Sequence, residues 1–147
     1  EPRRPRQDGR GLEPPETFKV LHFSHREAWV RDHGLNCDLL AMATVALERY
    51  RDTQDPALCN FAERQINWVL GANPLGYCML EGYGTSHPPG VDPAVGTGPV
   101  RGGIPNGIIG RGLDNVPVWG PSWESREYWL PQNAYLLAAL SLLPAGR

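Results

Sequence analysis

The last helical segment of the sequence limits the fold more than any other feature. The stretch "PQNAYLLAALSLL" (131–143) opens with proline, which is tolerated at the first position of a helix. A helix that is apolar all round must be buried on several sides. We therefore expect this helix to pack against more than one neighbour. The leucines that wrap around most of its circumference are Leu136, Leu137, Leu140, Leu142 and Leu143.

Two further helices are predicted upstream, near 36–52 and 56–71. Asp55 provides an N-cap, Pro56 the first helical position, and Gly71 a helix end. Because only a short polar turn separates the two helices, an antiparallel helical hairpin is predicted. Apolar residues at helical spacing are Leu39, Leu40, Ala43, Ala46, Leu47 and Tyr50 in the first, and Leu58, Phe61, Ala62, Ile66 and Val69 in the second.

Glycine and proline are concentrated in one part of the chain. Residues 82–112 hold ten of the seventeen glycines and five of the fifteen prolines. Loops of this length in compact domains are usually functional or disordered, so we expect 72–125 to be irregular. Residues 1–17 are interpreted as a disordered or strapping segment, and 18–147 as the folded part. Three helices of about 20 Å would struggle to surround the last one, so the chain is expected to have neighbours that it does not carry.

Composition narrows the choice of partners. The net charge is −2 and 41% of residues are apolar, which fits a single soluble globular domain and not a nucleic-acid binder. No apolar run approaches the roughly 20 residues that span a membrane. The chain begins with Glu and has no leader, so an upstream region has been removed or the chain is incomplete. Cys37, Cys59 and Cys78 lack metal-ligand spacing and are interpreted as buried thiols, and no metal or cofactor is predicted.

The segment "WGPSWESREYWLPQNAY" combines aromatic rings with carboxylates. Flat aromatic faces stack on sugar rings, and carboxylates perform glycosidic acid/base chemistry. A core aromatic cluster beside a solvated helix start is the alternative, and composition alone favours it. The positive end of the last helix favours ionised Glu127, whereas burial favours the protonated form that a general acid needs, and the sequence leaves both open. The residues concerned are Trp119, Trp123, Tyr128, Trp129, Glu124 and Glu127.

Four segments resemble glycoside hydrolase family 9. "FAERQINWVLGANPLGYCMLEGYG" is similar to the family segment in which a helix ends in a Gly-x-Asn-Pro turn and leads to Gly-aromatic-Gly. "SREYWLPQNAYLLAAL" resembles its final motif, in which Glu is followed six residues later by Asn-Ala; Glu127, Asn133 and Ala134 keep this spacing. "DHGLNCDLLAMATVAL" and "GGIPNGI" (102–108) are similar to the preceding helix and to the glycine-rich loop between the motifs. The resemblance covers roughly 30–143 in colinear order.

The resemblance implies an all-α fold, the C-terminal part of an (α/α)6 toroid with a helical hairpin, a final helix and a long loop. Family members hydrolyse β-glucans and related β-glycosides with inversion, and are taken to be extracellular or periplasmic. Glu127 would be the general acid, protonating the leaving oxygen. Substrate contacts would come from Tyr83, His87, Trp119, Trp123, Tyr128 and Trp129, with Asn73 and Asn133 structural at the site.

Two departures from the family pattern leave two functions open. The usual His-His-Arg is replaced by His87-Pro88-Pro89-Gly90, so His87 is only a partial counterpart. The aspartates that activate water belong to the family's N-terminal part, which nothing here resembles. The first hypothesis is the C-terminal portion of a β-glycoside hydrolase, completed by a missing N-terminal segment of the same protein. The second is a non-catalytic truncated toroid, a structural or carbohydrate-binding subunit covered by copies of itself or by another chain.

Overall fold

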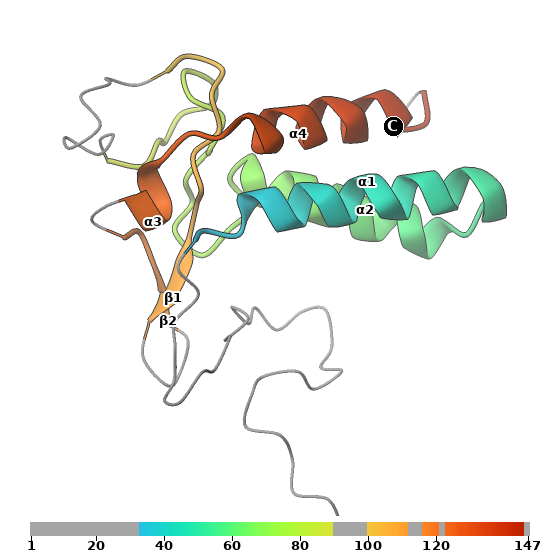
Figure 1. The fold of residues 1–147 in the computed structure, drawn as a ribbon. Helices are drawn as coiled ribbons and strands as arrows, with labels where there is room; N and C mark the ends of the chain where they lie inside the picture. Colours follow the sequence, from blue (N-terminus) through green and yellow to red (C-terminus); the bar gives the residue numbers. More distant parts are fainter. Residues whose placement is uncertain (1–32, 90–99, 112–115, 121–122, 146–147) are drawn as a thin grey trace, which may run out of the picture.

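Three long helices run side by side at one end of the molecule, and a looped region with a small ribbon forms the other (Figure 1). The computed structural model describes residues 33–89, 100–111, 116–120 and 123–145, so the predicted segment 1–17 lies outside the described residues. The helices are α1 (Asn36–Thr53), α2 (Pro56–Val69), α3 (Trp123–Arg126) and α4 (Leu130–Leu142), and the strands are β1 (Ile109–Arg111) and β2 (Val116–Val118). The three predicted helices and the mostly helical fold are confirmed.

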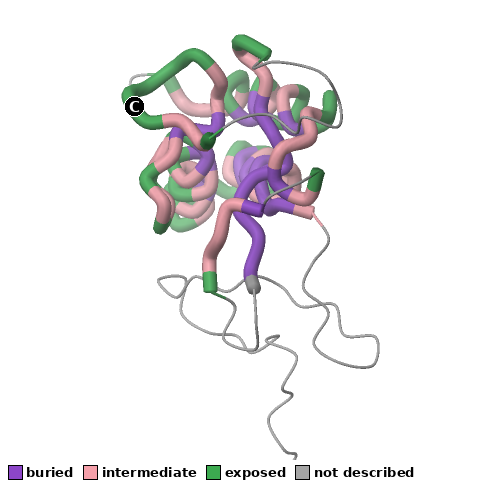
Figure 2. The backbone as a smooth tube through the Cα atoms, turned by 90° about the vertical axis from the view of Figure 1, so that its left-hand side faces the viewer, coloured by how far each residue is buried: buried purple, intermediate pink, exposed green. Residues whose placement is uncertain are grey.

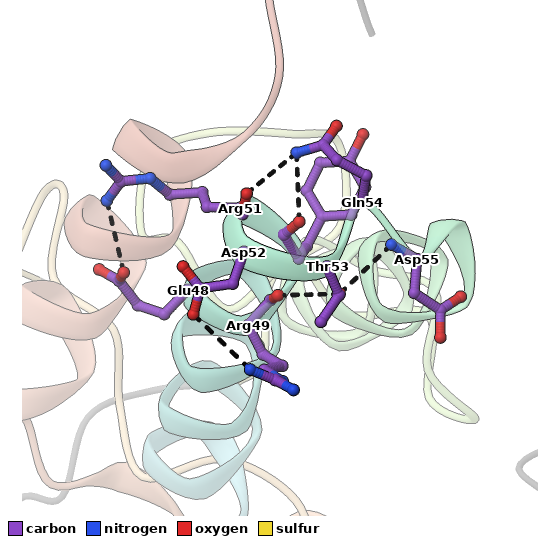
Figure 3. Close-up of polar contacts among 8 residues, drawn as sticks. Glu48, Arg49, Arg51, Asp52, Thr53, Gln54 and Asp55 are labelled. Atoms are coloured by element: carbon purple, nitrogen blue, oxygen red, sulfur yellow. Dashed lines mark hydrogen bonds and ion pairs between the residues drawn. The ribbon is translucent and has the colours of Figure 1, made fainter.

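The turn between α1 and α2 satisfies most of the backbone groups that the two helix ends leave open (Figure 3). Gln54 adopts a left-handed conformation (φ 55°), and its amide and side chain both donate to the Tyr50 carbonyl. Asp55 caps α2, because its Oδ1 accepts a hydrogen bond from the Ala57 amide at 2.9 Å. Pro56 follows at the first helical position, so the turn reverses the chain into the predicted hairpin.

The core lies between α1, α2 and α4, with α1 in contact with both other helices. Figure 2 shows the buried stretches gathered between the helices and continuing into the loop segment beside them. Four of the six predicted α1 residues are buried, whereas Leu39 and Tyr50 are half-buried. The buried core residues are Leu40, Ala43, Ala46, Leu47, Cys59, Ala62, Ile66, Val69, Met79, Ile104, Ile108, Leu136 and Ala139.

The region 72–125 is less irregular than the sequence predicts. Strands β1 and β2 pair as an antiparallel ribbon, with Ile109 opposite Val118 and Arg111 opposite Val116. A third element, α3, is a single turn of helix. Elements of three or four residues are too short to show a hydrophobic period, so the sequence pattern could not reveal them. The ribbon is an addition to a helical scaffold.

One face of α4 is exposed in this chain. Leu136 and Ala139 are buried, but Leu130 and Leu137 are 81% and 69% exposed on the opposite side. The expected burial on several sides is therefore present on one side within the described residues. None of the helices in the described part of the chain is both long and apolar enough to cross a membrane.

The Asp55 cap gives a test of the hairpin. Asp55→Ala removes the acceptor for the Ala57 amide and is expected to lower the free energy of unfolding by about 1 kcal/mol. Asp55→Asn keeps an oxygen acceptor and should retain most of the stability. Urea denaturation of both variants measures the difference, and equal losses would contradict the capping role.

Candidate active site

The segment 102–108 joins the start of α1 to the segment that carries Glu127. The Asn36 amide donates to the Asn106 carbonyl at 3.0 Å, and the Asn106 amide donates to the Glu127 carbonyl at 2.9 Å. Residues 104–110 are buried without a break (Figure 2). Glu127 therefore belongs to a segment whose backbone is hydrogen-bonded to the interior of the molecule.

Two glycines permit this close approach. A Cβ at Gly34 would lie 2.3 Å from the Asn106 carbonyl carbon and 2.4 Å from the Gly107 nitrogen. Gly107 has φ +104°, and a Cβ there would lie 2.5 Å from the Cγ of Asn36. Real Cβ atoms do not come so near to other atoms, so both positions require glycine if the segments are to touch.

Trp123 and Trp129 share a neighbour that the sequence analysis did not identify. The His33 ring meets both indoles edge-on, with centroid distances of 5.0 and 5.8 Å. Both tryptophans are exposed, at 41% and 47%. His33 has no motif around it, and it reaches this place because the adjacent Gly34 amide bonds to the Glu124 carbonyl. Only the tertiary structure shows this grouping.

Tyr128 has different neighbours from Trp129. It forms an isolated antiparallel bridge with Pro105, and because the backbone at Trp129 is extended, consecutive side chains point to opposite sides. A Cβ at Gly103 would lie 2.8 Å from the Tyr128 ring. Burial raises the pKa of Tyr128, and the negative charge of Glu81 raises it further.

The two asparagines that the sequence assigns to structural roles both organise loops. Asn133 donates from Nδ2 to the Gly102 carbonyl at 2.6 Å, and its Oδ1 accepts from the Ile104 amide at 3.1 Å. Asn73 donates to the carbonyls of Trp68 and Tyr77 and accepts from two amides of its own turn. Asn133 thus ties the first turn of α4 to the loop that binds the Glu127 segment.

The other predicted substrate contacts lie in separate neighbourhoods. Tyr83 is exposed under the Arg101 guanidinium, 5.6 Å from its carbon to the ring centroid. His87 Nδ1 lies 3.2 Å from the Cys78 carbonyl. Trp119 donates to the Pro89 carbonyl at 3.2 Å and meets the Tyr77 ring edge-on. Within the described residues, no hydrogen bond or ring contact joins these three side chains to Glu127.

The Glu127 side chain is half-buried, and its backbone is held at both polar groups. The amide donates to the Trp123 carbonyl at 3.3 Å, and the carbonyl accepts from Asn106. In the part of the chain that the structure describes, no three His, Cys, Asp or Glu side chains come close enough together to hold a metal ion.

These helices and loops form part of an (α/α)6 toroid, and the comparisons with known proteins agree. The model of glycosyl hydrolase family 9 matches residues 15–100, more than half of the chain. The chain therefore belongs to glycosyl hydrolase family 9. The match ends before Glu127.

Two crystal structures of the cellulase Cel9M of C. cellulolyticum, one in complex with cellobiose, are similar in fold. For each, the identity is 20% and the TM-score 0.59, over 78% of this chain and 30% of Cel9M. The chain thus spans about a third of the length of that enzyme. None of the curated proteins compared with the chain matches it.

The Tyr128 environment predicts a pH dependence of stability. Because the pKa of Tyr128 in the folded protein lies above its ordinary value of 10.0, the stability contributed by the neutral phenol is complete below about pH 10 and is lost as the pH rises further. Tyr128→Phe should weaken the fall in unfolding free energy above about pH 10. Tyr135→Phe is the control, because it removes a phenol that lies on α4 away from Glu81. Identical pH profiles for the wild type and the two variants would contradict the assignment.

Proposed function

We propose that this chain supplies the general-acid side of the active site of an inverting β-glycoside hydrolase that acts on a β-glucan or a related polysaccharide. The observation that carries the proposal is the position of Glu127. It lies half-buried on a segment hydrogen-bonded to 102–108, six residues before Asn133, which is bonded to the same loop. Family membership and the cellobiose complex of Cel9M support a carbohydrate as the substrate.

An inverting reaction requires a pair of carboxyl groups. One protonates the leaving oxygen, and the other activates a water on the opposite face of the sugar, about 6.5–9.5 Å away. Glu127 takes the first role in this proposal, because its spacing to Asn133 matches the final motif of the family. We propose that the base is an aspartate on another part of the toroid.

Sugar rings would bind against the exposed aromatic side chains. Trp123 and Trp129, which flank Glu127 in the sequence, are exposed, and His33 contacts both rings edge-on. Tyr83, His87 and Trp119 on the neighbouring loops would contact sugar units farther from the bond that is cleaved. Tyr128 is held toward Glu81, so its role would be to orient the loop.

Replacing Glu127 tests the proposal in the native polypeptide that contains this chain. Glu127→Gln removes proton donation while keeping shape, so kcat should fall by about 10²–10⁴-fold, with substrate binding largely retained. The loss should be much smaller for an aryl β-glycoside whose acidic phenol leaves without a proton. Steady-state kinetics on both substrates, with the Kd of an oligosaccharide, measure this.

Glu124→Gln is the matched control for this experiment. Glu124 lies one turn earlier, in α3, and is also half-buried. Its replacement should cost little with either substrate. Equal losses for both variants would remove Glu127 from the role of acid.

The apolar outer face of α4 indicates how the site is completed. Leu130, Ala134 and Leu137 follow helical spacing on this face, and Leu130–Leu142 contains no charged residue. Among the described residues, the main helix contact of α4 is with α1. We propose that the face packs against further helices of the same toroid, which would also carry the catalytic base, since the chain spans 30% of Cel9M.

Leu137 and Val45 are exposed to nearly the same extent in this chain. Replacing each of them therefore distinguishes a face that is covered in the native polypeptide from one that stays in water. Leu137 on α4 is 69% exposed, and Val45 on α1 is 70% exposed. Val45 lies four residues before Arg49, which pairs with Asp52 on the exposed surface (Figure 3). In the native polypeptide, Leu137→Ala should lower the free energy of unfolding by about 2–5 kcal/mol. Val45→Ala should cost less than about 0.5 kcal/mol.

Small losses for both variants would mean that the α4 face stays in water. Sedimentation analysis adds a second outcome. If copies of the chain cover this face, the molecular mass measured by sedimentation should depend on protein concentration. Leu137→Asp should then abolish that dependence. Such a result would favour the self-assembling structural or carbohydrate-binding subunit over the enzyme.

A further inference from the structure

Asn106 uses all four of its hydrogen-bonding groups on three segments: the start of α1, residues 123–127 and the first turn of α4. Its amide donates to the Glu127 carbonyl at 2.9 Å, and its carbonyl accepts from the Asn36 amide at 3.0 Å. Its side-chain Nδ2 donates to the Trp123 carbonyl at 2.8 Å, and Oδ1 accepts from Gln132 Nε2 at 2.8 Å. The residue is 2% exposed. One buried asparagine is therefore hydrogen-bonded to α1, to α4 and, twice, to the segment 123–127 that carries Glu127.

The two bonds to 123–127 fix the orientation of that segment. Trp123 begins the α3 turn and Glu127 directly follows its last residue, Arg126, and the Glu127 amide also donates to the Trp123 carbonyl. Asn106 therefore holds both ends of one helical turn from one side. A turn of four residues has little stability of its own, so its orientation depends on such outside contacts.

The partners of Asn106 are themselves restrained. Gln132 is 2% exposed in the first turn of α4, and Asn36 is fully buried, with its Nδ2 bonded to the Pro105 carbonyl at 2.9 Å. Oδ1 of Asn36 and Oε1 of Gln132 have no hydrogen-bond partner among the described residues. Burying polar groups without a hydrogen-bond partner costs free energy. Such a cost is not expected in a loop that only connects two elements.

We infer that Asn106 is a positioning residue for the reaction. It sets the placement of Glu127 relative to Trp123, and thus relative to the sugar bound there. This inference rests on the proposed function, because it assumes that Glu127 is the acid. Gln132 acts through Asn106 by fixing its side-chain oxygen. Neither Asn106 nor Gln132 touches the substrate.

Asn106→Asp is the sharpest test in the native polypeptide. Aspartate keeps the acceptor for Gln132 but replaces the donor to Trp123 with an oxygen that repels the carbonyl. Misplacement of a reacting group by about 1 Å can cost on the order of 10²-fold in rate. We expect kcat to fall by about 10–100-fold for a substrate that needs protonation and much less for an aryl glycoside with an acidic phenol, with KM nearly unchanged.

Hydrogen exchange provides a readout that does not depend on activity. Amides of 123–129 should exchange about tenfold faster or more in Asn106→Asp, while those of α1 and α2 keep their protection. Gln132→Met, which leaves the bond to Trp123 intact, should shift both readouts in the same direction but less, and serves if Asn106→Asp does not fold. Leu47→Ala is the core control and should affect both substrates equally.

The outcomes separate this inference from the proposed function. If Glu127→Gln shows the dependence on the leaving group and Asn106→Asp does not, the inference alone has failed. It has also failed if exchange accelerates equally in α1, α2 and 123–129, because Asn106 would then be a general stability residue. If Glu127→Gln itself lacks the dependence, the proposed function has failed, and the positioning role falls with it.

Discussion

The backbone crossing at Gly34 and Asn106 is the contact on which the looped half of the structure depends. Neither α1 nor α4 has a side-chain cap at its N-terminus, and helix starts leave amides that need partners. The crossing lets the Asn106 carbonyl accept from the first amide of α1. A Cβ at Gly34 would lie 2.3 Å from that carbonyl and collide with it. The first amide of α1 therefore finds its acceptor only because two glycine-bearing segments meet here.

The helical half could be read from the sequence because its determinants are local. Asp55, Pro56 and Gly71 mark helix ends through side-chain chemistry that acts within a few residues. The apolar period of α1 identifies its buried face, although Leu39 and Tyr50 are only half-buried because they lie at the edge of that face. The motif resemblance added the toroid, which short-range patterns cannot specify.

The looped half could not be derived in the same way. Asn106 precedes Gly107 in a Pro-Asn-Gly sequence that by itself indicates an exposed turn, yet the segment is buried. His33 joins Trp123 and Trp129 through a contact between residues about ninety positions apart. The family resemblance singled out Asn133, but the loop to which its side chain is hydrogen-bonded depends on the tertiary arrangement.

Different parts of this chain thus provide its stability and fix the orientation of the segment with Glu127. The core of α1, α2 and α4 is held by apolar burial, which is strong but non-directional. The segment with Glu127 is held by hydrogen bonds between distant backbones, which are directional and individually contribute only about 1 kcal/mol. Side chains such as Trp123 and Trp129 can therefore remain exposed without loosening the segment that carries them, because its orientation is set from the buried side by Asn106. The acid role that we propose for Glu127 requires a carboxylate held at a fixed angle to a bound sugar, and this role depends on such support more than on a larger core.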